Sequence, residues 1–309
     1  MSGPCIVGLG ELLWDMLPGA GGNVNAQLGG APANFAVACG RLGARAVVAS
    51  AVGHDALGER AVAVLEKNGA DTSHIQRNDL PTSEVLVELD GGGHASYNIV
   101  EPVAWDALDW TPEWTRLAQE TDAICFGTLA QRNAQSRETV RRMVVETRLE
   151  AVRVFDVNLR SPYWDDDALA WGLQHATILK LNEDELPLVL EAMGKPSTTD
   201  EAAGSETLLH LGPRLKLVCV TLGGRGCLLT MQDEQVRAGG FPAKVVDTIG
   251  AGDAFTAAMV TYWMRERPLD GIAAAANRLG SYVASRMGAM PEFSDELLAE
   301  LDGYSQGGQ

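Results

Sequence analysis

Short apolar runs alternate with longer helical patterns through most of this sequence, and that rhythm restricts the folds available to it. Beyond Glu120, each apolar run is followed by a stretch with helical periodicity. The runs are Ala123–Gly127, Val152–Asp156, Ile178–Leu181 and Leu217–Thr221. Strands separated by helices need crossover connections, which make neighbouring strands parallel and place helices against the sheet. We therefore predict an α/β fold with a mostly parallel sheet and helices on both faces.

The N-terminal third of the chain contains two further strand patterns outside this rhythm. One is Gly22–Leu28, and the other is Glu84–Val100, in which apolar residues alternate with more polar neighbours. Such alternation indicates a sheet with one buried face. We expect a small β-sheet lid formed by roughly residues 12–28 and 82–103, on a single α/β domain that spans residues 1–309.

The charge balance restricts the partners of the protein. The chain has 41 acidic and 24 basic residues, and its formal net charge is −17. Proteins that bind nucleic acid or anionic membranes use clusters of Lys and Arg, so this excess of acid argues against both partners. The five cysteines form no CxxC pair, and the sequence shows no secretion signal or membrane span. We expect a cytoplasmic protein with reduced core cysteines.

The segment Asp247–Phe255 carries the strongest chemical signal. Its Gly-Ala-Gly run, Gly250 to Gly252, lets successive backbone amides approach one anion. The apolar stretch Ala254–Met264 is predicted to be helical, and a helix N-terminus favours negative charge. Asp253 at that point is placed to accept a proton from a substrate hydroxyl. The same residues would also suit a glycine turn followed by a helix-capping Asp.

A second signal is the segment Gly29–Ala36, in which paired glycines lead into a predicted helix. Glycine lets a ligand lie close against the backbone, and the Asn34 amide can hydrogen-bond to hydroxyl groups. An ordinary loop and helix start would also explain this segment.

Together these two segments resemble the signatures of the ribokinase-like, or PfkB, family of carbohydrate kinases. Asp247–Asp253 is similar to the DTxGAGD signature of that family near its C-terminus. Further similar segments follow in the family's order, namely Gly8–Asp15, Gly53–Gly58, Asn182–Glu185 and Thr221–Gly226. The resemblance implies a ribokinase-like fold that transfers the terminal phosphate of ATP to a sugar hydroxyl. The chain has no GxxxxGK[ST] loop, so it is not a P-loop kinase.

The resemblance also implies roles for individual residues. Asp253 would be the general base, and the amides of Gly250, Ala251 and Gly252 would form the anion hole. The residues implied to bind the sugar are Asp15, Gly30 and Asn34. The residues implied to line the nucleotide site are Asn182, Thr221, Gly223, Gly226 and Asn277. Asn182 and Glu185 would organise Mg²⁺ through water, and the carbonyls of Asp247 and Ile249 could bind a monovalent cation such as K⁺.

The substrate is less constrained than the reaction. Phe155–Trp164 resembles the D-x-N-x-R segment of fructokinases and 2-keto-3-deoxygluconate kinases, and Phe126–Ala130 is similar to a fructokinase segment. Arg160 could pair with a phosphate or a substrate carboxylate, or could be a structural loop residue. Tyr97 could stack on a sugar or fill the apolar face of the lid. We expect a fructokinase first, a 2-keto-3-deoxygluconate kinase second, and an aminoimidazole riboside or other nucleoside kinase third.

Other classes of protein can use similar folds. A non-catalytic binding or regulatory protein on this scaffold would be expected to lack Asp253 or its glycines, and all are present. A dinucleotide-binding oxidoreductase would need G-x-G-x-x-G, but Leu13 stands where the third glycine belongs after Gly8 and Gly10. An exposed apolar face on the lid would favour a homodimer.

Overall fold

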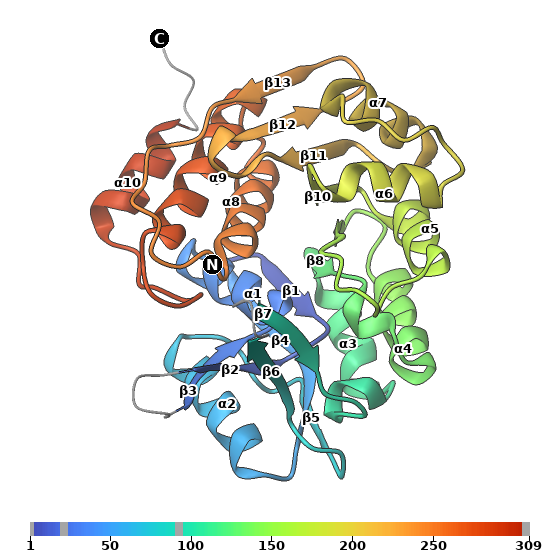
Figure 1. Ribbon diagram of the computed structural model, residues 1–309, viewed down its shortest axis with the longest axis vertical. Coiled ribbons are helices and arrows are strands. Elements are labelled where there is room, and N and C mark those ends of the chain that lie inside the picture. Colours follow the sequence, from blue (N-terminus) through green and yellow to red (C-terminus); the bar gives the residue numbers. More distant parts are fainter. Residues whose placement is uncertain (1–2, 19–23, 90–94, 305–309) are drawn as a thin grey trace.

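The computed structural model describes residues 3–18, 24–89 and 95–304, and two sheets organise them (Figure 1). The main sheet contains β1 (Cys5–Leu9), β4 (Arg45–Gly53), β5 (Ile75–Asn78), β8 (Ala123–Phe126), β9 (Val152–Asp156), β10 (Ile178–Asn182), β11 (Leu217–Thr221), β12 (Cys227–Thr230) and β13 (Gln235–Ala238). Its nine strands run in the order β13-β12-β11-β10-β9-β8-β1-β4-β5. All neighbours from β11 to β5 pair in parallel, whereas β12 pairs antiparallel with β11 and with β13.

Helices cover both faces of this sheet (Figure 1). One face packs against α1 (Ala31–Arg41), α8 (Ala251–Met264), α9 (Leu269–Ala284) and α10 (Asp295–Tyr304). The other packs against α3 (Pro112–Glu120), α4 (Ala134–Glu146), α5 (Asp166–His175), α6 (Glu185–Ala192) and α7 (Glu201–Leu211). Because both faces of the inner strands are buried, β1, β8 and β11 carry mostly apolar residues instead of alternating with polar ones, whereas the edge strands β5 and β13 are partly exposed. The predicted α/β fold with a mostly parallel, doubly covered sheet is confirmed.

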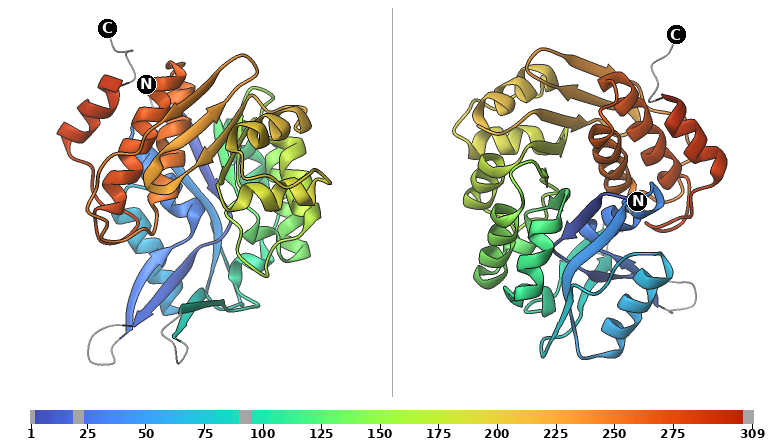
Figure 2. Two further views of the ribbon diagram at one scale, coloured as in Figure 1. Left: turned by 45° about the horizontal axis from the view of Figure 1, so that its top comes forward. Right: turned by 180° about the vertical axis from the view of Figure 1, so that it is seen from behind.

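A smaller sheet projects from one end of the main body (Figure 2). Its strands are β2 (Leu13–Pro18), β3 (Val24–Gly29), β6 (Ser83–Leu89) and β7 (Ala95–Ile99), in the order β3-β2-β6-β7. They come from the two segments predicted to leave the main domain. Besides the apolar cores on the two faces of the main sheet, a further core joins this smaller sheet to β4, α1 and α2 (Ala56–Lys67). Trp14 and Leu65 are fully buried in it.

Polar side chains fix where several helices begin. The carboxylate of Asp165 accepts the Ala168 N–H at 2.8 Å at the start of α5, and Asp55 accepts the Gly58 N–H at 2.7 Å at the start of α2. Such caps satisfy backbone donors that the first turn leaves free. The caps therefore set the register of each helix relative to the preceding strand.

Gly8 in β1 allows the central strand to approach α1. A Cβ atom at Gly8 would lie 2.0 Å from the carbonyl oxygen of Pro32, a backbone atom that cannot rotate away. We predict that Gly8→Ala lowers the free energy of unfolding by about 3 kcal/mol, because overpacking forces backbone shifts. Denaturant unfolding would measure the change.

Gly303→Ala is the matched control, since a Cβ there meets nothing within 4 Å. It should leave stability within about 1 kcal/mol of wild type or raise it slightly. Equal stability of the two variants would contradict this account of the β1–α1 contact.

Candidate active site

The candidate site lies at the carboxyl ends of the parallel strands, next to β1. From β1 the chain builds the sheet outward through β4 on one side and through β8 on the other, so this is a topological switch point. Ligands in open α/β sheets bind in the crevice outside the strand ends at such a point. A cavity of about 420 Å³ opens there. The residues lining it are Glu11, Leu13, Asp15, Gly30, Ala31, Asn34, Val85, Ile99, Leu129, Asn158, Arg160, Lys180, Thr248, Ile249, Gly250, Gly252 and Asp253.

One wall of the cavity is the small second sheet. Leu13 on β2, Val85 on β6 and Ile99 on β7 present buried apolar side chains to it. The loop that leads into α8 also lines the cavity. The cavity is therefore closed by segments from both ends of the sequence.

The loop before α8 is held in an unusual backbone conformation. Gly250 is the helix N-cap with φ 78°, and a Cβ there would lie 2.6 Å from the Cβ of Ala289. The Asp247 carboxylate anchors the loop, because it accepts the N–H groups of Ile249 and Gly288, both at 3.0 Å. The N–H of Ala251 already donates to the Thr248 carbonyl at 3.3 Å. Of the three amides predicted for the anion hole, Ala251 would have to exchange this long bond to bind an anion.

Asp253, in the first turn of α8, faces the cavity. Its Oδ2 accepts a hydrogen bond of 2.8 Å from the Asn34 side-chain amide on α1. Burial has the largest effect on Asp253 and, together with the charge of Asp156, raises its pKa to about 6. The hydrogen bond from Asn34 and the charges of Lys180 and Arg160 act in the opposite direction and lower this pKa. A carboxylate with such a pKa is ionised at neutral pH and is a stronger base than an exposed one.

Beneath Asp253 lies a buried ion pair. The Lys180 Nζ is 3.0 Å from Asp156 Oδ1, and the Thr256 hydroxyl donates to Asp156 Oδ2 at 3.0 Å. Burial lowers the pKa of Lys180, but the charges of Asp156, Glu185 and Asp253, together with the hydrogen bond to Asp156, outweigh burial and raise it. A Cβ on Gly252 would lie 3.4 Å from the same Nζ, so this cation sits directly against the predicted anion hole.

The residues predicted to bind the sugar meet in the same cavity. Gly30 has φ 109°, and a Cβ there would come within 2.5 Å of the Glu11 carbonyl oxygen, so only glycine fits. Asp15 lies on β2, and burial raises its pKa to about 6 although the charge of Arg160 opposes this. Arg160 itself is exposed at the mouth of the site.

Comparisons with known proteins agree with this geometry. The model of the pfkB family carbohydrate kinases matches residues 12–296. The chain belongs to the pfkB family of carbohydrate kinases. A sugar kinase of Pyrococcus horikoshii is 31% identical over 278 residues, 86% of this chain and 84% of the relative. Fructokinase from Solanum tuberosum is 31% identical over 272 residues, 84% of this chain and 81% of the relative.

The fold of the family is found across the whole chain. The structure of fructokinase with bound ATP from Xylella fastidiosa superimposes with a TM-score of 0.84, covering 98% of this chain and 99% of that one, at 23% identity. This kinase therefore has the ribokinase-like fold, and it is an ATP-dependent sugar kinase. Within the described residues, no helix is long and apolar enough to cross a membrane.

The residues predicted to organise Mg²⁺ form a reciprocal backbone clamp in the kinase. Asn182 Oδ1 accepts the Glu185 N–H at 2.9 Å, while Glu185 Oε2 accepts the Asn182 N–H at 2.8 Å. Glu185 Oε1 also accepts the Leu159 N–H at 2.7 Å and so ties α6 to the loop after β9. Asn182 Oδ1 also accepts the Asp184 N–H at 2.9 Å, so both of its lone pairs are engaged, whereas each Glu185 oxygen keeps a second lone pair. This arrangement suits contact with a cation through water better than direct ligation.

The predicted nucleotide residues lie apart from the cavity. Thr221 ends β11, and Gly223 and Gly226 flank a short turn with φ 54° and 99°. Asn277 on α9 directs its amide nitrogen at the carbonyls of Ala238 and Gly239, at 3.4 and 3.3 Å, and so joins α9 to the end of β13. A nucleotide role for these residues stays a prediction.

Tyr97 is the remaining predicted substrate residue. It pairs with Val87 in the register of β7 and β6, but its side chain lies outside the described part of the structure. Its predicted stacking on a sugar therefore stays a prediction.

No role was predicted for four polar residues in or beneath the candidate site, Glu11, Asp156, Asn158 and Lys180, although Asp156 and Asn158 stand in the D-x-N-x-R segment. Lys180 interrupts the buried apolar run of β10, and a charged residue in such a run is a signal that it has a partner. Glu11 follows β1 directly, at the edge where ligands bind. These two signals were available in the sequence, but the pairing of Lys180 with Asp156 was not.

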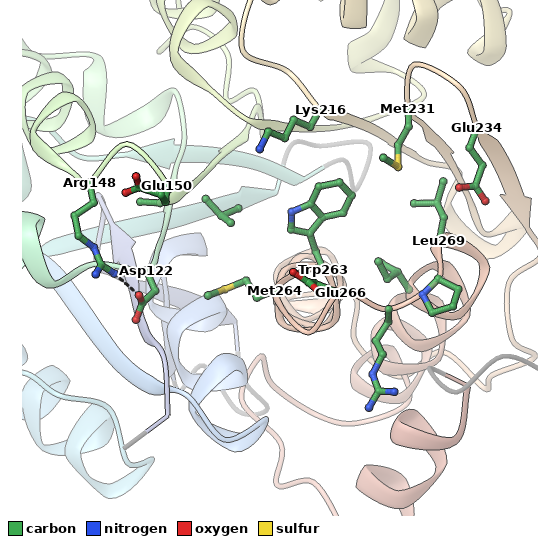
Figure 3. A pocket seen from close by; sticks show the side chains of 15 residues that line it. Asp122, Arg148, Glu150, Lys216, Met231, Glu234, Trp263, Met264, Glu266 and Leu269 are labelled. Carbon is green, nitrogen blue, oxygen red and sulfur yellow. Dashed lines mark hydrogen bonds and ion pairs between the residues drawn. The ribbon is translucent and has the colours of Figure 1, made fainter. Parts of the chain in front are cut away.

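A cavity of about 690 Å³ lies elsewhere, at the amino ends of β9 and β11 (Figure 3). Trp263 and Met264, from the last turn of α8, form its apolar wall, and an ion pair between Asp122 and Arg148 lies at its rim. It contains none of the predicted catalytic or binding residues. The smaller cavity is the candidate active site, because the predicted catalytic and sugar-binding residues meet there.

The pKa of Asp253 predicts a pH dependence of the kinase. If Asp253 is the general base it must be ionised, so kcat/KM should fall as the pH drops through about 6. Asn34→Leu removes the hydrogen bond that lowers the pKa of Asp253, and the midpoint of this acid limb should therefore move to higher pH. Rates measured across the pH range would show the shift.

Glu11 and Asp15 titrate in the same range and contribute to this acid limb, so the readout is the difference in midpoint between the variant and wild type. Asn133→Ala, at an exposed helix cap, is the control and should leave the midpoint in place. An unchanged midpoint in Asn34→Leu would contradict the assigned role of this hydrogen bond.

Proposed function

We propose that this carbohydrate kinase transfers the γ-phosphate of ATP to a hydroxyl of fructose, with Asp253 as the general base. The observation that carries the proposal is the Asp253 carboxylate, held by Asn34 at the N-terminus of α8 and facing a cavity lined by further sugar-binding side chains. The similarity to the potato fructokinase supports fructose as the acceptor.

In the proposed mechanism the attacking hydroxyl lies against Asp253 Oδ1 or Oδ2 and loses its proton to that carboxylate. The raised pKa of Asp253 makes the transfer easier than it would be to an exposed aspartate, because the base and the proton donor are better matched. Asn34 keeps the carboxylate oriented throughout. After transfer the proton leaves Asp253 to solvent when the site opens.

The start of α8 would stabilise the charge on the phosphoryl group. The free N–H groups and the dipole of a helix of 14 residues converge on the loop at Gly250 to Gly252. The Lys180 ammonium adds a fixed positive charge beside Gly252. Groups already oriented before the reaction stabilise developing charge without reorganising.

The second sheet would act as the lid. Its apolar side chains at Leu13, Val85 and Ile99 would exclude water from the sugar, which limits hydrolysis of ATP. Association of two copies through this sheet stays a prediction, and sedimentation velocity would test it.

Cations complete the proposed site. When bound with ATP, the divalent cation neutralises charge on the phosphate oxygens. Asn182 and Glu185 would hold it through water, in keeping with their backbone clamp. The carbonyls of Asp247 and Ile249 are the proposed ligands of a monovalent cation.

A 2-keto-3-deoxygluconate kinase is the second candidate, and Arg160 is the observation that favours it. The guanidinium lies at the mouth of the cavity, where its charge reaches Glu11, Asp15 and Asp253. It could pair with the carboxylate of a sugar acid. Against this, the cavity already contains three carboxylates, which repel another anion.

Activity on a panel of acceptors tests the proposal. We expect rapid ADP release with fructose, and slower release with 2-keto-3-deoxygluconate, ribose, aminoimidazole riboside and adenosine. Asp253→Asn should lower kcat by about a thousandfold or more while ATP binding stays within a few fold, because the base acts only in the chemical step. A coupled assay and calorimetry would measure the two effects.

Near-normal turnover in Asp253→Asn would overturn the role of Asp253. Fast release with another acceptor would replace fructose with that acceptor. No ADP release with any acceptor of the panel, while ATP still binds, would favour a non-catalytic regulatory protein.

Cation removal tests the remaining assignments. EDTA should abolish turnover, because the phosphate charge is then unscreened. Exchange of K⁺ for tetramethylammonium should lower kcat if the loop carbonyls bind a small monovalent cation, and it should change nothing if they do not. Initial rates at constant ionic strength would distinguish the two results.

A further inference from the structure

Glu11 is a buried acid that the proposed mechanism does not use. It follows β1 in the loop to β2 and is 5% exposed. Two hydrogen bonds fix the backbone of this loop. The Ser50 hydroxyl donates to the Gly10 carbonyl at 2.7 Å, and the Gly10 N–H donates to the Ala49 carbonyl at 3.1 Å. The Glu11 side chain therefore has a defined position, and it lines the same cavity as Asp253.

One oxygen of the Glu11 carboxylate has no partner. Within the described residues, Oε2 is buried and accepts no hydrogen bond. Burial raises the pKa of Glu11 to about 7, although the backbone N–H groups of Glu11 and Ala31 lower it. A buried acceptor without a donor destabilises a protein, and its persistence in a cavity points to a ligand that supplies the donor.

The cavity contains a second acceptor of this kind. Asn34 uses its amide nitrogen on Asp253, while its Oδ1 is buried and unpartnered within the described residues. Two free acceptors on one cavity call for a ligand rich in O–H or N–H donors. A metal ion is a poorer match, because the described residues contain no group of three or more His, Cys, Asp or Glu that could hold one.

The charges of the cavity select among donor-rich ligands. Glu11, Asp15 and Asp253 are carboxylates, while Arg160 is the cation at the mouth and Lys180 is paired with Asp156. A neutral polyol supplies donors and brings no charge. A sugar acid adds a negative charge to three others in a site of low dielectric constant, which is unfavourable.

We infer that Glu11 is a specificity-determining residue, whose free oxygen accepts a hydrogen bond from a hydroxyl of a neutral sugar and whose charge disfavours sugar acids. This inference rests on the proposed sugar-kinase site and deepens it. Glu11 would bind a sugar hydroxyl that does not react, because Asp253 accepts the proton of the hydroxyl that does.

Two substitutions separate the charge of Glu11 from its hydrogen bond. Glu11→Gln removes the charge and keeps an acceptor, and Glu11→Leu removes both in a similar volume. We expect the KM for fructose to rise about tenfold in Glu11→Gln and further in Glu11→Leu. The KM for ATP should stay within about twofold of wild type in both variants. The ratio of kcat/KM for fructose to that for 2-keto-3-deoxygluconate should fall at least about tenfold in both.

Glu191→Gln, on the exposed surface of α6, is the matched control and should leave every parameter unchanged. Melting temperatures measured at about pH 8 show whether the variants fold. The melting temperatures of both Glu11 variants should equal or exceed that of wild type. The folded pKa of Glu11 lies above its unfolded value, so its ionisation destabilises the fold as pH rises through about 7. If neither variant folds, Glu11→Asp replaces them: its shorter side chain should raise the sugar KM and keep the discrimination against sugar acids.

An unchanged sugar KM in folded Glu11 variants would overturn the inference, and so would an equal rise in the KM values for sugar and ATP. Failure of the proposed function has a different signature, in which the wild type phosphorylates no sugar of the panel. Sugar binding would then be measured directly by calorimetry with fructose and a non-hydrolysable ATP analogue, and loss of that binding in Glu11→Leu would support the inference.

Discussion

The hydrogen bond between Asn34 and Asp253 joins the two halves of the site, and the rest of the arrangement depends on it. The two residues are 219 positions apart, and the bond of 2.8 Å connects the first turns of α1 and α8. Each helix begins directly after a glycine with positive φ, Gly30 at 109° and Gly250 at 78°. Because both helices pack side by side on one face of the sheet, their N-termini open onto the same cavity.

The buried charges of Asp156 and Lys180 affect the pKa of Asp253 more than they stabilise the fold. Asp156 and Lys180 neutralise each other in the interior, yet Asp156 still raises the pKa of Asp253 while Lys180 lowers it. Buried ion pairs contribute little net stability, because desolvation of both charges offsets their attraction. In the proposed mechanism the pair provides a fixed electric field at the predicted anion-binding loop, where oriented charge would aid phosphoryl transfer. Glu11 and Asp253, with raised pKa values, add a cost to the fold that a bound substrate would relieve.

The second sheet gives the kinase a cavity that the main sheet alone would not form. An open parallel sheet offers only a crevice at its strand ends. Here β2 continues from the loop after β1, so Glu11 and Asp15 reach the cavity from one short segment. Val85 and Ile99 close it from the other excursion. Asp15 on the second sheet and the loop before α8 therefore bring the predicted sugar and phosphate sides of the site together from different layers of the fold.

The alternation of apolar runs and helices determined the doubly covered parallel sheet, because a parallel strand pair requires a crossover whatever the rest of the chain does. The start of the helix Asp166–His175 is set locally, since the neighbouring Asp165 caps its first turn. The hairpin of β12 and β13 was not predicted, and the ordered motifs identified the family but not the free oxygen of Glu11 or the partner of Lys180. Those features depend on long-range contacts: Lys180 meets Asp156 only when β9 and β10 pair, and a pKa is raised only when distant segments exclude water. Local signals in the sequence decide which elements form, whereas burial and the meeting of distant side chains are decided by the tertiary structure alone.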